Sequence, residues 1–126
     1  MKVIVADDSK ATRSIVKKML KQIDRRIEVF EAEDGEKALE ILYEQEKVDL
    51  ILLDWNMPNM DGFEFLKTVK KDPRWKDIKV MMITSKTSEK DVEEALNAGA
   101  DEYLMKPFDK DMLKAKMDLI LGGESE

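Results

Sequence analysis

The sequence of 126 residues contains no cysteine and no histidine. The absence of cysteine excludes disulfide bonds, thiolate metal sites and thiol catalysis. The absence of histidine excludes an imidazole general base, a histidine-ligated zinc site and a phosphohistidine on this chain. Any chemistry that depends on an imidazole must therefore come from a partner protein.

Long apolar segments and an excess of positive charge are also missing. No apolar run approaches the ~20 residues of a membrane span, and the opening residues MKVIVAD lack the features of a signal peptide. We therefore expect a cytoplasmic protein that does not bind membranes. The net charge of −6, from 22 Lys and Arg against 28 Asp and Glu, argues against nucleic acid as a direct ligand, because phosphate neutralisation needs a basic surface.

Five short apolar runs alternate with amphipathic stretches, which predicts an α/β fold with a parallel sheet covered by helices on both faces. The runs are residues 3–6, 27–31, 50–53, 80–83 and 103–105. VIVA, LILL and VMMI are continuously apolar, as interior parallel strands are. IEVFE mixes charge into its run and is typical of an edge strand.

Apolar residues at helical spacing predict five helices between and after these strands. Residues 88–91 resemble a capping box, Gly99 stands where a helix would end, and Asp109 would cap the last helix. Residues 122–126 are predicted to be a frayed tail. The periodic positions expected to be buried include Ile15, Met19, Leu20, Ile23, Val92, Ala95, Leu96 and Ala98.

Polar residues collect where the predicted strands end. Asp7 and Asp8 follow the first strand, and Asp54 follows the third. Thr84 and Lys106 follow the fourth and fifth. Ligands of open α/β sheets bind at this edge, and neighbouring strands would bring the three carboxylates together. Their mutual repulsion is relieved by a divalent cation, and oxygen ligands alone favour Mg²⁺, with Mn²⁺ possible.

This set of residues indicates phosphoryl transfer to Asp54. A carboxylate is a competent nucleophile towards phosphorus and has no proton to lose. The reaction needs mainly positioning and neutralisation of oxygen charge, which the Lys106 ammonium and the Thr84 hydroxyl could supply. Taken singly, the acidic pair reads as a helix cap, the threonine as a strand end and the Lys-Pro dipeptide as a turn. The pattern is specific because each member ends a different strand.

The sequence resembles the receiver domain of bacterial two-component response regulators over essentially its whole length. The resemblance rests on EAEDG at 31–35, DWNMPNMDG at 54–62, AGA at 98–100 and KPF at 106–108, and it looks closest to the chemotaxis members of the family. It implies a flavodoxin-like (βα)5 fold with strand order 2-1-3-4-5. It also implies that residues 1–126 are a single receiver domain without an output domain.

The resemblance implies roles for the acidic residues and their neighbours. Asp54 would be the phosphoacceptor and a metal ligand. Asp8 would bind Mg²⁺ directly, and Asp7 would act largely through water. Asn56 would offer its backbone carbonyl to the metal, with its side chain near the water that later hydrolyses the phosphoryl group.

The remaining site residues would bind the phosphoryl group and report its presence. Lys106 would pair with one phosphoryl oxygen, and Thr84 would move in to hydrogen-bond another. Tyr103 would swing inward in the activated state, so Thr84 and Tyr103 together form the expected switch. The Lys106-Pro107 peptide bond would be cis.

The resemblance also implies the partners of a signalling protein that catalyses its own phosphorylation and dephosphorylation. The donor would be a histidine kinase or a phosphotransfer protein, and a phosphatase is possible. The output would be a protein bound in trans, such as the flagellar motor switch, and the chain is expected to be a monomer. A basic stripe that could aid donor docking contains Arg13, Lys17 and Lys21. The predicted output face carries Lys86, Lys90, Tyr103 and Lys110.

Three other functions compete with this one. The protein could be a phosphorelay intermediate or a phosphate sink without motor output. It could be a Mg²⁺-dependent small-molecule phosphohydrolase of the haloacid dehalogenase type, although those enzymes place the nucleophile after the first strand and a second Asp where this chain has Asn56. It could also be a constitutive binding module with a vestigial site.

Overall fold

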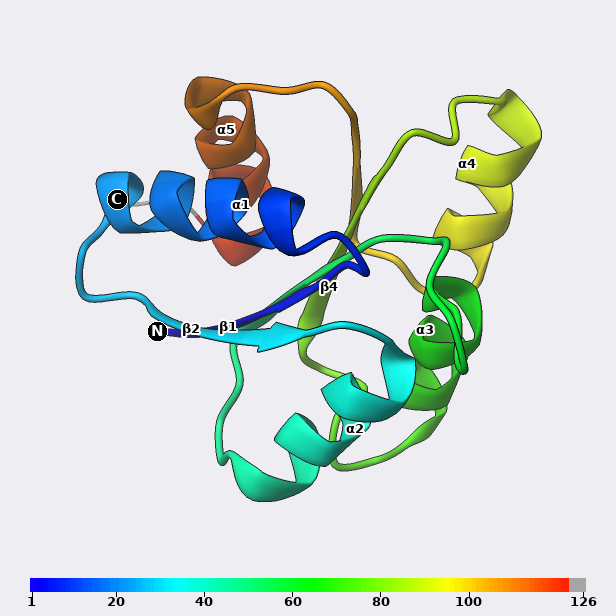
Figure 1. Cartoon of the computed structure of the whole chain (residues 1–126). Coiled ribbons are helices and arrows are strands. Elements are labelled where there is room, and N and C mark those ends of the chain that lie inside the picture. The colour runs from blue at the N-terminus through cyan, green and yellow to red at the C-terminus, as the bar shows by residue number, and fades with distance from the viewer. Residues whose placement is uncertain (123–126) are drawn as a thin grey trace.

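The computed structural model describes residues 1–122, and a five-stranded parallel sheet in the order β2-β1-β3-β4-β5 forms its central layer (Figure 1). The strands are β1 (Lys2–Ala6), β2 (Glu28–Ala32), β3 (Leu50–Leu53), β4 (Lys79–Thr84) and β5 (Glu102–Met105). The helices are α1 (Lys10–Ile23), α2 (Gly35–Glu44), α3 (Gly62–Lys71), α4 (Glu89–Asn97) and α5 (Lys110–Leu121). The predicted fold class and strand order are confirmed, whereas most of the predicted tail lies outside the described residues.

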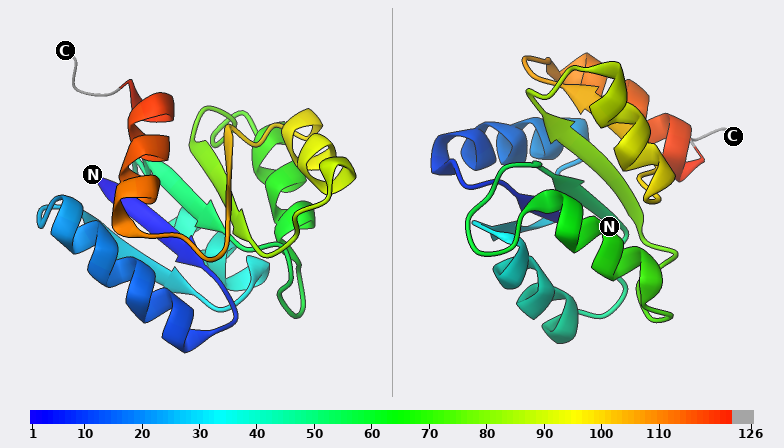
Figure 2. Two further views of the ribbon diagram at one scale, coloured as in Figure 1. Left: turned by 90° about the horizontal axis from the view of Figure 1, so that it is seen from above. Right: turned by 90° about the vertical axis from the view of Figure 1, so that its right-hand side faces the viewer.

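Helices cover both faces of the sheet, with α1 and α5 on one face and α2 and α3 on the other (Figures 1 and 2). Alternate residues of a strand point to opposite faces, so β1 contributes to two separate cores. Ile4 joins a cluster with side chains of α2, α3 and α4. Val5 joins the other cluster, with α1 and α5.

The position of each strand in the sheet follows from its apolar content. All residues of β3 are buried, because β1 and β4 flank it and helices cover both of its faces. β2 lies at the edge, where Glu28 is exposed and only Ala32 is fully buried. The mixed charge of this run thus predicted its edge position correctly.

Side-chain caps fix where the helices begin. Ser88 Oγ accepts a hydrogen bond from the Asp91 amide at 3.1 Å, and an Asp109 carboxylate oxygen accepts one from the Met112 amide at 2.8 Å. Each bond satisfies an amide that has no partner in the first turn. Gly99 follows α4 with a φ of +111°, which glycine adopts without strain. These predicted boundaries are confirmed.

Two positions expected to be buried are exposed instead. Ile15 is 56% exposed and Leu96 is 46% exposed. In α1 the buried stripe is centred on Val16 and Leu20, and Ile15 stands about 100° away from Val16 around the helix axis. Leu96 has the same relation to the buried Ala95 in α4. Ile15 and Leu96 are apolar but lie one residue away from the buried stripe of their helix, so the prediction that they are buried was wrong.

Candidate functional site

The register of β1 and β3 brings the acidic residues to one point at the carboxyl edge of the sheet. Ala6 pairs with Leu53, and the Asp54 amide donates to the Ala6 carbonyl at 2.9 Å. As a result, one carboxylate oxygen from each of Asp7, Asp8 and Asp54 lies within 4.8 Å of the others. Asp7 and Asp54 are buried, and Asp8 is exposed.

The Asp7 carboxylate is held in place by the start of α1. Its Oδ1 accepts a hydrogen bond from the Ser9 amide at 2.8 Å. The guanidinium of Arg13 donates to the Asp7 carbonyl at 2.6 Å and also pairs with Glu31 at 3.0 Å. This arrangement leaves Asp7 Oδ2 for a contact with the opposite side of the site.

Lys106 supplies that contact from the end of β5. Its Nζ lies 2.9 Å from Asp7 Oδ2 and 3.4 Å from Asp54 Oδ2. The Lys106 amide donates to the Thr84 carbonyl at 3.0 Å, and the predicted cis Lys106-Pro107 peptide is present. The expected approach of Lys106 to Asp54 is seen, but the shorter ion pair is with Asp7.

Burial and neighbouring charges act in opposite directions on these groups. Burial raises the pKa of Asp54, and the negative charge of Asp7 adds to that effect, while Lys106 and the Trp55 amide oppose it. Burial acts to lower the pKa of Lys106, but its hydrogen bond to Asp7 and the charges of Asp54 and Asp7 outweigh burial and raise it. Lys106 is therefore a cation at neutral pH.

Thr84 is completely buried at the end of β4. Its Oγ1 accepts a hydrogen bond from the Lys86 amide at 3.3 Å. A hydroxyl that accepts one bond still has its proton to donate. In this structure the Thr84 hydroxyl therefore bonds within its own turn and keeps a proton that it can donate.

Tyr103 is buried, and its hydroxyl donates to the Lys86 carbonyl at 2.8 Å. Burial raises the pKa of Tyr103, and the charges of Asp91 and Asp54 add to that effect. We expected Tyr103 on the output face with an inward position only after activation. In this structure the Tyr103 side chain already lies inward, whereas Lys90 and Lys110 of the predicted output face are exposed and Lys86 is half-buried.

The basic stripe on α1 is also less available than expected. Arg13 pairs with Glu31 at 3.0 Å, and Lys17 lies 3.8 Å from the same carboxylate. The Lys21 ammonium donates to the Ile27 carbonyl. Glu31 belongs to β2, so the charge of the stripe is partly neutralised by the neighbouring strand.

The loop after Asp54 contains Asn56, which is exposed, and ends at a glycine whose role sequence reasoning missed. A Cβ on Gly62 would lie 2.0 Å from the Asp54 carbonyl oxygen, and the Gly62 amide donates to the Trp55 carbonyl at 2.8 Å. Asp61 caps α3, and its Oδ1 accepts a hydrogen bond from the Glu64 amide at 2.9 Å. Only the three-dimensional structure shows that Gly62 is also needed for the close approach of the start of α3 to the backbone at the end of β3.

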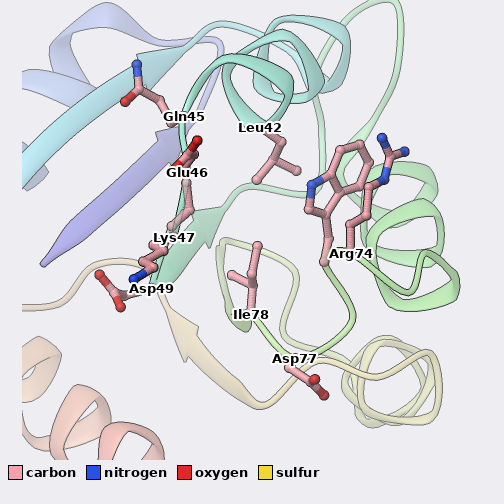
Figure 3. Close-up of a pocket in the computed structure, with 10 residues that line it drawn as sticks. Leu42, Gln45, Glu46, Lys47, Asp49, Arg74, Asp77 and Ile78 are labelled. Atoms are coloured by element: carbon pink, nitrogen blue, oxygen red, sulfur yellow. The ribbon is translucent and has the colours of Figure 1, made fainter.

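A cavity of about 470 Å³ lies at the other end of the sheet, between the α2–β3 and α3–β4 connections (Figure 3). Arg74 and Lys47 line it together with Glu46, Asp49 and Asp77. It is remote from Asp54 and carries no set of convergent groups of one charge. The chemistry-bearing residues instead lie at the open carboxyl edge of the sheet.

Comparison with known proteins agrees with this arrangement. Residues 3–118 match the model of the response regulator receiver domain. A chemotaxis protein CheY homolog of Campylobacter jejuni is 38% identical over 122 residues, which cover 97% of this chain and 93% of that protein. Chemotaxis protein CheY1 of Helicobacter pylori is 39% identical over 122 residues, covering 97% and 98%.

Solved structures show the same similarity. Vibrio cholerae chemotaxis protein CheY4 has a TM-score of 0.85 at 35% identity, covering 94% of this chain and 97% of that one. The Mn²⁺-bound form of response regulator Rcp1 has a TM-score of 0.82 at 29% identity, covering 99% and 96%. Among the described residues, no helix is both long and apolar enough to cross a bilayer.

Proposed function

The chain belongs to the response regulator receiver domain family, and on that premise we propose that it is a CheY-like signalling protein in which Asp54 accepts a phosphoryl group. The donor is a histidine kinase or a phosphotransfer protein, as membership of this family implies. The observation that carries the proposal is the convergence of Asp7, Asp8 and Asp54 within 4.8 Å beside the Lys106 ammonium.

The acidic cluster fits a hard divalent cation. Its three ligand oxygens come from carboxylates, two of them buried, and such ligands suit Mg²⁺ or Mn²⁺. Asp7, Asp8 and Asp54 would hold the ion together with the backbone carbonyl of Asn56. When bound, the ion neutralises charge on the phosphoryl oxygens. The Mn²⁺-bound form of the similar regulator Rcp1 supports the same choice of metal.

The transfer itself needs no proton acceptor on this chain. An Asp54 carboxylate oxygen attacks phosphorus, the O–P bond forms and the P–N bond to the donor histidine breaks, leaving the electron pair on the imidazole nitrogen. The Lys106 ammonium, 3.4 Å from Asp54 Oδ2, neutralises developing charge, and the Thr84 hydroxyl donates to a phosphoryl oxygen. Water later attacks phosphorus and releases inorganic phosphate, which restores the Asp54 carboxylate.

A chain of hydrogen bonds connects this chemistry to the surface. Thr84 Oγ1 accepts from the Lys86 amide at 3.3 Å, and the Lys86 carbonyl accepts from the Tyr103 hydroxyl at 2.8 Å. Movement of Thr84 to a phosphoryl group would weaken its bond to Lys86 and shift the turn that holds Tyr103. The exposed lysines of that region, Lys90 and Lys110, would then present a changed face to a downstream protein.

The decisive experiment is incubation with Mg²⁺ and an acyl phosphate, followed by intact mass and peptide mapping. We expect one phosphoryl addition at Asp54, and none in EDTA or in Asp54→Asn. Asp77→Asn, which changes an acidic residue at the other end of the sheet, is the matched control and should react normally. Phosphorylation at another residue, or none at all, would refute the proposal. Sustained hydrolysis of phosphate esters would favour the phosphohydrolase instead.

The output requires a separate experiment. Partner capture with and without beryllofluoride should recover a protein, such as a flagellar motor component, only with the loaded form. Capture that does not depend on the loaded state would favour a constitutive binding module. Phosphorylation without any state-dependent partner would favour the phosphate sink or relay intermediate. The monomeric state and the cytoplasmic location stay predictions.

A further inference from the structure

A side-chain pair outside the acidic cluster ties the loop after β3 to the turn before α2. The Asn59 Nδ2 amide donates to Asp34 Oδ2 at 2.6 Å, across 25 positions of sequence. The other oxygen, Asp34 Oδ1, accepts from the Lys37 amide at 2.8 Å and caps α2. Asp34 is only 5% exposed. Each carboxylate oxygen therefore has its own partner, and only one of them serves the helix.

The backbones beside this pair are also in direct contact. The Gly35 amide donates to the Met60 carbonyl at 2.9 Å. A Cβ on Gly35 would lie 2.7 Å from that same oxygen, so only glycine allows this approach. Asn59 has a φ of +66°, a left-handed conformation that asparagine tolerates better than most residues. The loop thus holds an uncommon conformation at the residue whose side chain anchors it.

The charge of Asp34 strengthens its bond to Asn59. Burial acts to raise the pKa of Asp34, but hydrogen bonds from the Lys37 amide and from Asn59 lower it below its ordinary value. The carboxylate is ionised at neutral pH, and hydrogen bonds to ionised groups are stronger than those between neutral ones.

We infer that Asp34 and Asn59 are a positioning pair that holds the loop carrying Asn56 beside the acidic cluster. The inference rests on the proposed function, in which Asn56 offers its backbone carbonyl to the metal. The loop leaves the sheet at Asp54, whose amide is bonded to the Ala6 carbonyl, and it is anchored again at Asn59. Asn56 lies between these two points, so its backbone has little freedom. Neither Asp34 nor Asn59 touches the reacting atoms.

Two variants with the net charge of the wild type separate positioning from electrostatics. Asn59→Gly removes the amide while relieving the left-handed backbone. The exchange variant Asp34→Asn/Asn59→Asp reverses the direction of the hydrogen bond. An amide at position 34 still offers an oxygen to cap α2, and its nitrogen can donate to the carboxylate at position 59.

The first measurement is Mg²⁺ affinity. The fluorescence emission of Trp55 serves as its readout, because Trp55 is next to Asp54 in the chain. Outer partners of metal ligands are typically worth about 10- to 100-fold in affinity. Because the pair acts on a single carbonyl ligand, we expect the low end, about tenfold weaker binding in Asn59→Gly. The exchange variant should bind within about threefold of the wild type, since it keeps the pair and the charge.

The second measurement needs no metal. The Gly35 amide donates to the Met60 carbonyl in the intact loop. In EDTA, hydrogen exchange at this amide should be about tenfold faster in Asn59→Gly than in the wild type, because the variant lacks the charge-assisted bond from Asn59 to Asp34. The exchange variant should restore the slow rate. A purely structural role would lower the melting temperature of Asn59→Gly and leave its Mg²⁺ affinity unchanged.

The inference is overturned if Asn59→Gly binds Mg²⁺ as the wild type does, or if the exchange variant is as weak as Asn59→Gly. A wild type without any Mg²⁺ response also overturns it. If the wild type binds Mg²⁺ but takes up no phosphoryl group at Asp54, the proposed function fails while these affinities still decide the positioning role.

Discussion

Lys106 and a divalent cation should compete for the same carboxylates, and Lys106→Met tests this directly. The Lys106 ammonium lies 2.9 Å from Asp7 and 3.4 Å from Asp54, and its side chain is 25% exposed. Methionine is similarly long and flexible but carries no charge. The substitution therefore leaves the buried carboxylates without their cation while changing the packing little.

The stability cost follows from these distances. At 2.9 Å and an effective dielectric constant of ~20, the attraction to Asp7 is about 6 kcal/mol before dehydration is counted. Removing one partner of a buried ion pair usually costs about 3–5 kcal/mol. Because Lys106 is partly exposed, we expect a loss of about 2–3 kcal/mol in EDTA. For a domain of this size that is a decrease in melting temperature of roughly 8–12 °C.

Mg²⁺ should reverse most of this loss, since it neutralises the same carboxylates. Suppose that the difference in unfolding free energy between the wild type and Lys106→Met falls to about 1 kcal/mol at saturating Mg²⁺. The thermodynamic cycle then requires Mg²⁺ to bind Lys106→Met about 5- to 30-fold more tightly than it binds the wild type. Urea unfolding in EDTA and in Mg²⁺ measures the stability, and Trp55 emission measures the affinity.

Lys37→Met is the matched control, because Lys37 and its partner Glu40 are both more than half exposed. Exposed pairs contribute about 0–1 kcal/mol, and this loss should not depend on Mg²⁺. Equal destabilisation of Lys106→Met with and without Mg²⁺, or an unchanged Mg²⁺ affinity, would refute the competition.

Three further outcomes are expected. Gly62→Ala should destabilise the protein by about 3 kcal/mol or more in urea unfolding, since its Cβ would lie 2.0 Å from the Asp54 carbonyl oxygen. The control is Gly122→Ala, where φ is +86° but no atom lies within 4 Å of the added Cβ, and it should cost about 1 kcal/mol. Tyr103→Phe should lose the bond to the Lys86 carbonyl and about 1 kcal/mol, and an unchanged Lys86 carbonyl shift by NMR would contradict this. Because burial raises the pKa of Asp54 above its ordinary 3.8, its stabilising contribution is complete below that value and is lost as pH rises through the folded pKa. Metal-free Asp54→Asn should therefore gain stability relative to the wild type as the pH rises above 3.8, and a constant difference would show that the shift is absent.

The fold was predictable because its signals are local. Continuous apolar runs marked β1, β3 and β4 as interior strands, and the charges of β2 marked an edge, since burial on both faces excludes unpaired charge. The same local logic failed at Ile15 and Leu96, which are exposed. The hydrophobicity of a residue does not show how much of the surface of its helix will be covered by the neighbouring strands and helices.

The candidate site was predictable to the extent that strand ends locate it. The site residues lie at the ends of four parallel strands, so strand pairing brings them to one edge of the sheet. Asp7 and Asp8 follow β1, Asp54 follows β3, Thr84 ends β4 and Lys106 follows β5. Sequence could not show that Lys106 pairs more closely with Asp7 than with Asp54, because that choice depends on side-chain geometry. Sequence also does not show which position Tyr103 adopts in a given state, and in this structure its side chain is buried.

The sequence by itself determined the order of the elements and the residue types at the carboxyl edge, because both depend on periodicity and on short-range spacing along the chain. Only the tertiary structure decided the contacts between segments that are distant in sequence. The Asp34–Asn59 bond, across 25 positions, and the Lys106–Asp7 ion pair, across 99 positions, are of this kind. They arise when packed helices and paired strands bring separate loops together, and no local pattern encodes the resulting distance.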